Sequence, residues 1–338
     1  MEPTSTGTAK RKIIELMRVP SQDHDPDWLK TSLQAAVELE MSTIPPYLCA
    51  MWSIKDPADP VRGMIRDIVL EEMSHLGTAC NMLTTVGGTP ALNTSDAVPT
   101  YPGPLPGGVH PGLVVSLSGL TKDVVKSVFM EIELPESGPL AFAEGMAFPT
   151  IGAFYDSILQ AFQQIPPGTV TGERQLNHPF GGPADLIEIH SVADAETAIA
   201  RIKQQGEGTA QSPVGDPLEP GENLAHYYQF AEIWHGRRLV ASNGTFEFTG
   251  DPIPFPDVFP MAIVPPEGYP KESAEFDKQY KSLLDGLQAA WTTGNPDELL
   301  NAIGVMDSMG DTAVSLMQTP LPTGQGTFGP DFKLPTSN

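Results

Sequence analysis

Hydrophobic positions spaced three and four residues apart predict two long helices in the first quarter of the chain. In residues 27–54, one helical face carries Leu29, Leu33, Ala36, Glu40 and Tyr47. In residues 60–88, an unbroken stripe with the same spacings carries Val61, Ile65, Ile68, Glu72, His75, Ala79 and Met82. Three ionisable residues therefore occupy apolar stripes, and an unpaired buried carboxylate is costly, so something must compensate Glu72.

Shorter helical patterns follow, and irregular segments separate them. Helices are predicted in residues 120–133, 150–165, 194–206 and 222–239, and a short strand is expected at 186–189. Two amphipathic helices close the chain, with stripes at Phe276, Tyr280, Leu283 and Leu287, and then at Leu299, Ala302, Met306, Met309, Ala313 and Leu316. Residues 89–120 and 246–270 are so rich in proline and glycine that we expect long loops.

Composition narrows the class of protein. The 338 residues are 40% hydrophobic, without an apolar run of spanning length, which indicates a soluble globular protein. With 42 acidic and 19 basic residues, the net charge of −23 argues against nucleic acid and anionic membranes as partners. Two cysteines cannot form a disulfide framework. The N-terminus lacks a secretory apolar stretch, so we expect a cytoplasmic location.

The motif Glu72-Met-Ser-His75 is the main candidate for chemistry. Residues at i and i+3 of a helix aim at one point, and Glu40 on the preceding antiparallel helix faces them. Carboxylate-bridged metal sites in four-helix bundles are built in this way, and carboxylate with imidazole suits iron or manganese. The alternative is a buried Glu–His pair that stabilises the core without a metal.

Two further residues are candidates for this site. Tyr47 should lie two turns beyond Glu40 on the same face, either as a core aromatic or as a hydrogen-bond donor to a ligand. His226 shares a stripe with Phe230 and Ile233, where it is either a core histidine or the missing ligand from another helix. The sequence has no phosphate-binding loop, nucleophile elbow, dinucleotide fingerprint or C-x-x-C motif.

Several segments together resemble the ferritin-like domain of the iminophenyl-pyruvate dimer synthase family, known from bisindole pathways of the violacein and rebeccamycin type. The resemblance covers about residues 25–318. The segments that carry it are EMSTIPPYL (40–48), EEMSHL (71–76), NML…GGTP (81–90), TIGAFY (150–155), QGEGT (205–209) and HYYQF (226–230).

This resemblance implies a mainly α protein, a ferritin-like four-helix bundle with long loops and an extra C-terminal helix pair. The expected division is an N-terminal segment (1–24), one domain (25–320) and an irregular tail (321–338). Implied ligands of one or two non-haem metal ions, iron or alternatively manganese, are Glu40, Glu72, His75, His226 and Glu207. Because Glu207 follows a helix stop at glycine, Glu222 is an alternative.

One position departs from the family pattern. The segment I-G-x-F-Y often carries glutamate at its middle position, where this chain has Ala153. Either the site holds one metal ion, or another acidic residue supplies the carboxylate. The candidates are Asp156, Glu144, Glu131 and Glu133.

The resemblance implies a metal-dependent oxidase or oxygenase of secondary metabolism that uses dioxygen and a small, amino-acid-derived substrate. Tyr47 would hydrogen-bond a ligand. Dimerisation of an indole imine is not transferred, because those enzymes carry the domain within a much longer polypeptide. The alternatives are a metal-binding bundle without turnover and a non-redox enzyme acting on an imine or keto acid. The sequence is compatible with a homo-oligomer.

Overall fold

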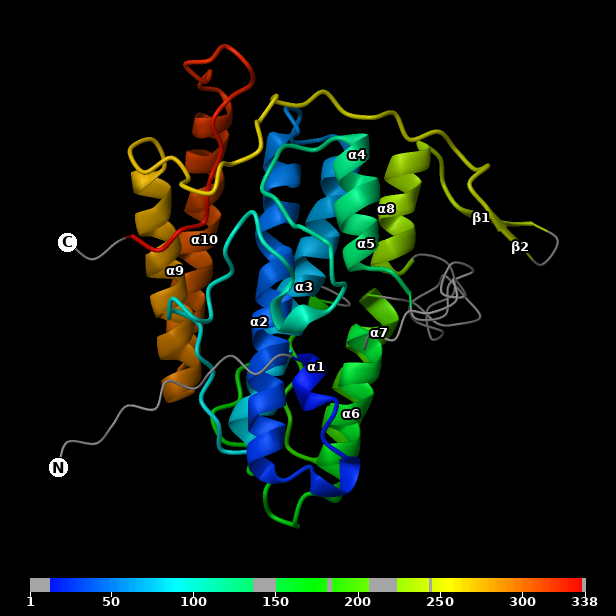
Figure 1. Cartoon of the computed structure of the whole chain (residues 1–338), viewed down its shortest axis with the longest axis vertical. Helices are drawn as coiled ribbons and strands as arrows, with labels where there is room; N and C mark the ends of the chain where they lie inside the picture. The colour runs from blue at the N-terminus through cyan, green and yellow to red at the C-terminus, as the bar shows by residue number, and fades with distance from the viewer. Residues whose placement is uncertain (1–12, 136–149, 181–183, 207–223, 243–244, 336–338) are drawn as a thin grey trace.

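The computed structural model describes residues 13–135, 150–180, 184–206, 224–242 and 245–335. Its centre is an antiparallel pair of long helices, α2 (Pro26–Ser53) and α3 (Pro60–Thr85), drawn in blue in Figure 1. Both begin with an aspartate cap followed by proline. Asp25 accepts from the backbone N–H of Trp28 at 2.7 Å, and Asp59 accepts from that of Val61 at 2.8 Å. These caps satisfy N–H groups that a helix start leaves unpaired.

The other half of the bundle consists of two short helical pairs stacked along α2 and α3 (Figure 1). One pair is α8 (His226–His235) beside a continuous segment made of α4 (Lys122–Val124), the π-helical turn η3 (Val125–Phe129) and α5 (Met130–Ile132). The second pair is α6 (Ile151–Gln164) and α7 (Val192–Gly206). The ends of α5 and α7 and the beginnings of α6 and α8 therefore meet midway along the bundle.

A C-terminal hairpin of helices lies on the other side of α2 (Figure 1). It consists of α9 (Ala274–Thr293) and α10 (Pro296–Met317), separated by Gly294 in the left-handed conformation. The chain after α10 is irregular yet packed, because Phe332 is buried against Trp52 and Phe276. The remaining elements are α1 (Ile13–Leu16), η1 (Ser21–Asp23), η2 (Pro106–Gly108) and the antiparallel hairpin of β1 (Val240–Ser242) and β2 (Thr245–Glu247).

Two prolines lie inside α2 without ending it. Pro46 has no N–H, so the carbonyl of Ser42 cannot make its usual helical hydrogen bond to residue 46. The hydroxyl of Tyr101, from the long loop after α3, donates to that carbonyl at 2.7 Å. The loop thus satisfies a backbone group that the proline leaves unpaired.

The predicted mainly helical bundle is confirmed, including the long loops and the final helix pair. The strand expected at 186–189 is wrong: these residues are irregular, and the Asn81 side chain donates to the carbonyl of Ile187. Cys49 and Cys80 are buried free thiols. Among the described helices, none combines the length and apolarity needed to cross a membrane.

Candidate metal centre

Two sets of three buried side chains share one glutamate at the level where the four helix ends meet. The first set is Glu40, Glu72 and His75, and the second is Glu72, Glu133 and His226. Within each set, the candidate ligand atoms all lie within 4.8 Å of one another. Helices α2 and α3 provide the first set, whereas Glu133 directly follows α5 and His226 begins α8.

Glu72 lies between the two histidines. Its Oε1 atom is 3.7 Å from Nδ1 of His75 and 2.8 Å from Nδ1 of His226. The outer carboxylates complete each set. Oε2 of Glu40 lies 3.8 Å from Nδ1 of His75, and Oε2 of Glu133 lies 3.7 Å from Nδ1 of His226. The arrangement can hold two metal ions with Glu72 as their common carboxylate ligand.

Both imidazoles use Nε2 for a protein contact, which turns Nδ1 toward the carboxylates. Nε2 of His75 donates to Oε1 of Gln205 at 2.8 Å, and Nε2 of His226 donates to Oε2 of Glu71 at 2.7 Å. Nδ1 of His226 is buried, and no described residue offers it a partner in hydrogen-bonding geometry. A buried nitrogen lone pair aimed between two carboxylates fits a metal ion.

Each candidate carboxylate is held by a hydroxyl group. The hydroxyl of Tyr155 on α6 donates to Glu40, Thr43 donates to Oε2 of Glu72 at 2.6 Å, and Tyr47 donates to Oε1 of Glu133 at 2.6 Å. These contacts fix the orientation of the carboxylates, as the outer hydrogen bonds of metal sites do. One oxygen of Glu40, Glu72 and Glu133 remains directed at the histidines.

Burial and the neighbouring charged groups together shift the pKa values in this cluster. Burial and the nearby charge of Glu72 raise the pKa of Glu40 well above its ordinary value, and burial followed by Glu72 also raises the pKa of Glu133. For Glu72, burial alone would raise the pKa, but the imidazole of His226 beside it outweighs burial and lowers the pKa. Burial likewise opposes the charged form of His226, yet the surrounding carboxylates raise its pKa well above the ordinary value.

The cluster therefore contains more acid than base. Glu71 joins the three candidate carboxylate ligands, and only two histidines oppose these four acids among the site residues described above. Burying such an excess of carboxylates is costly without a compensating charge. Divalent cations supply that charge, and the oxygen and nitrogen donors suit iron, manganese or zinc.

A cavity of about 40 Å³ adjoins the first set. One water molecule needs ~10–15 Å³, so the cavity has room for a few atoms beside the ligands. Its apolar wall comes from Leu39, Ile132, Ile151 and Ile202. Lys203 also lines it, and its ammonium group bonds Asp156 at 2.7 Å.

The structure brings most of the sequence-predicted residues together: Glu40, Glu72, His75, His226 and Tyr47. Tyr47 contacts the cluster through Glu133. Glu207 and its alternative Glu222 lie outside the described residues.

The acidic residue that completes the second set is Glu133, one of the four candidates considered from the sequence because position 153 is alanine. Asp156 lies 2.7 Å from Lys203 and is largely exposed, and Glu131 is exposed, so neither reaches the cluster. Glu144 lies outside the described residues. Glu133 therefore supplies a carboxylate that the sequence could not assign uniquely.

Four contributors were missed: Glu71, Thr43, Tyr155 and Gln205. Glu71 precedes Glu72, and adjacent helical residues point about 100° apart, so it lies off the stripe and toward α8. Tyr155 and Gln205 do occur in the segments TIGAFY and QGEGT. Their place in these two segments is the signal in the sequence that points to them.

The chain is similar to ferritin-like proteins in sequence and in fold. A family model described as Ferritin-like matches residues 33–235. A crystal structure of a ferritin-like protein from Caulobacter vibrioides aligns with a TM-score of 0.59 and 22% identity, covering 91% of this chain and 97% of that chain. At this identity the likeness shows the fold alone. No curated protein matches the chain.

Proposed function

We propose that this chain, which belongs to the ferritin-like family, is a non-haem iron oxidase or oxygenase with two metal ions. The observation that carries the proposal is the pair of buried ligand sets that share Glu72. Each set offers two carboxylates and one imidazole, whose Nε2 is already held by a neighbour. Incomplete protein ligand sets leave positions for oxidant and substrate, as catalytic metal sites require.

Iron bound at this centre would supply electrons for the activation of dioxygen. Glu40, Glu72 and His75 would hold one ion, and Glu72, Glu133 and His226 the other. Tyr47, expected from the sequence to hydrogen-bond a ligand, would act through its hydrogen bond to Glu133. The small cavity, mostly shielded by apolar side chains, would limit the access of water to the reacting atoms.

Lys203 supports an acidic, amino-acid-derived substrate. It is a cation at the wall of the cavity beside Glu40, and its side chain is 26% exposed. An incoming carboxylate would replace the exposed Asp156 as the partner of the ammonium group and place the rest of the molecule toward the metal centre.

The proposal is tested by anaerobic reconstitution with Fe(II), elemental analysis and measurement of dioxygen uptake. We expect about two iron ions per chain, and dioxygen consumption after exposure to air that increases when a substrate is present. Glu72→Gln should lose both iron binding and dioxygen consumption, because this residue belongs to both ligand sets. Substoichiometric iron in the wild type, or unchanged binding in Glu72→Gln, would overturn the proposal.

Two alternatives give different results in the same experiment. A bundle that stores or senses metal would bind iron but couple no dioxygen consumption to a substrate. The lack of a carboxylate at Ala153 favours this alternative, and Glu133 weakens it by completing the second set. Non-redox chemistry on an imine or keto acid would persist without dioxygen.

A further inference from the structure

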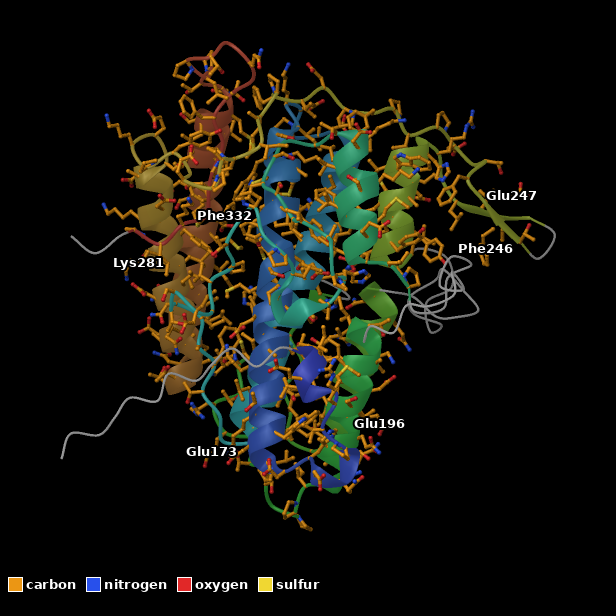
Figure 2. All side chains as sticks on the ribbon, in the orientation of Figure 1. Glu173, Glu196, Phe246, Glu247, Lys281 and Phe332 are labelled. Carbon is orange, nitrogen blue, oxygen red and sulfur yellow. The ribbon has the colours of Figure 1, made fainter. Side chains whose placement is uncertain are left out.

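A second cavity lies on the opposite side of α2 and α3 from the metal centre. Its volume is about 80 Å³, room for about five to eight water-sized positions at ~10–15 Å³ each. Helices α2, α3, α9 and α10 enclose most of it, and Phe332 of the C-terminal segment, labelled in Figure 2, forms part of the wall. None of the residues that line it is exposed.

The same two helices serve both sites. Met41 and Met73 line this cavity, and each directly follows a candidate metal ligand, Glu40 or Glu72. Adjacent residues on a helix point about 100° apart, so one helical pair presents carboxylates on one side and apolar groups on the other. The two cavities are therefore separate, with α2 and α3 as the wall between them.

The lining favours a neutral aromatic or hydrocarbon ligand. It contains no ionisable group except the phenol of Tyr280, whose pKa burial raises well above its ordinary value, so this wall carries no charge near neutral pH. Trp52, Trp291 and Phe332 offer aromatic surface, and methionines provide adaptable contacts. Water gains few hydrogen bonds in such a cavity, and apolar cavities bind benzene-like molecules.

Tyr280 adds a polar feature. The residue is 4% exposed and brings a phenol hydroxyl to a lining that is otherwise mostly apolar. A ligand with one acceptor atom, such as a phenol or a ketone, would accept a hydrogen bond from this hydroxyl.

We propose that the cavity between the α2–α3 pair and the α9–α10 pair binds a small, uncharged aromatic molecule, independently of the metal centre. A protein partner fits less well, because fifteen of the lining residues are buried and the other six are half-buried. The proposal does not depend on the redox function.

Toluene binding to the full chain tests this site, measured by calorimetry and by the rise in melting temperature that a native-state ligand causes. Ile303→Trp fills the cavity from a half-buried position on α10 and should weaken binding at least tenfold. The matched control is Leu300→Trp on the exposed face of the same helix, which should bind like wild type. Met306→Trp is a second filling variant in case the first does not fold.

Three results would overturn the proposal. The first is that the wild type shows no saturable toluene binding. The second is that a folded filling variant binds toluene with the affinity of the wild type. The third is that the wild type is a dimer which Ile303→Trp dissociates, because the cavity would then belong to an interface with a second copy. Glu72→Gln should still bind toluene, so failure of the metal proposal and failure of this one are distinguishable.

Discussion

Nδ1 of His226 lies 2.8 Å from Oε1 of Glu72, although no hydrogen bond joins them. Nε2 of the same imidazole donates to Glu71, the residue next to Glu72, so two adjacent glutamates contact opposite sides of one ring. The first residue of α8 is thereby fixed against the middle of α3. This contact joins the second ligand set to the first.

Glu133→Gln should remove one metal ion and leave the other. The carboxylate of Glu133 belongs to the second set alone, whereas Glu40 and His75 complete the first without it. Elemental analysis after reconstitution should give about one ion per chain instead of two. The matched control is Glu131→Gln, two residues earlier and exposed, which should keep two. Equal metal content in both variants would contradict the assignment.

Removal of metal should destabilise the native state. Ions that bind the folded chain stabilise it by about 4 kcal/mol when free metal is about 1,000 times the dissociation constant. Urea denaturation with and without added Fe(II), under anaerobic conditions, measures this difference. Glu72→Gln should lose the metal-dependent increment, because it takes part in both sets. An equal increment in that variant would place the stabilising ions elsewhere.

Tyr47→Phe should weaken metal binding at the second site about 10- to 100-fold, the usual effect of removing an outer hydrogen bond to a ligand. The hydroxyl of Tyr47 donates to Glu133. Competition with a chelator measures the affinity. Tyr101→Phe is the control, since it removes a buried hydroxyl that donates to the Ser42 carbonyl. It should cost about 1 kcal/mol of stability and leave metal affinity unchanged.

Asp277→Asn should change how stability depends on pH. Burial, then hydrogen bonding to Asp331 and its charge, raise the pKa of Asp277 to about 8. An unfolded aspartate titrates near ~3.9, so between these values the native state binds the additional proton. Stability from this group is therefore fully present below pH ~4 and lost as pH rises through about 8.

Urea titrations at pH 5 and pH 9 test the direction in which stability changes with pH. Asp277→Asn should become more stable relative to wild type as pH rises, because it cannot bury a charge beside Asp331. Asp285→Asn on the same helix is the control. Burial opposes ionisation of Asp285, but hydrogen bonds from Lys281 and Asn93 outweigh it and lower its pKa. Removing that carboxylate should not stabilise the protein at pH 9.

The sequence predicted those parts of the site that lie on long regular helices. Glu40, Glu72 and His75 stand out because each interrupts an apolar stripe whose period is clear over several turns. Glu133 follows the π-helical turn η3, where the hydrogen-bond spacing changes and the residue spacing no longer indicates which side chains share a face. Glu133 could therefore be named only as one of several acidic candidates.

Positions near helix ends account for two of the missed residues, Tyr155 and Gln205. Tyr155 lies near the start of α6 and Gln205 near the end of α7, so neither belongs to a long stripe that points at the cluster. Their contacts depend on how the two short helical pairs meet, which is a property of tertiary packing. The strand expected at 186–189 failed for a related reason: the Asn81 side chain, not a neighbouring strand, donates to the Ile187 carbonyl.

Pro46 removes one hydrogen bond from α2 and leaves a carbonyl to which the loop of residues 89–120 is attached. An alanine there would restore an N–H and let the helix recapture the carbonyl of Ser42, in competition with the hydroxyl of Tyr101. The helix itself would improve, while the loop of residues 89–120 would lose an attachment one residue from Thr43, the donor to Glu72. Improving this helix locally would thus release the loop that is attached to it, while the ligand sets would stay in place.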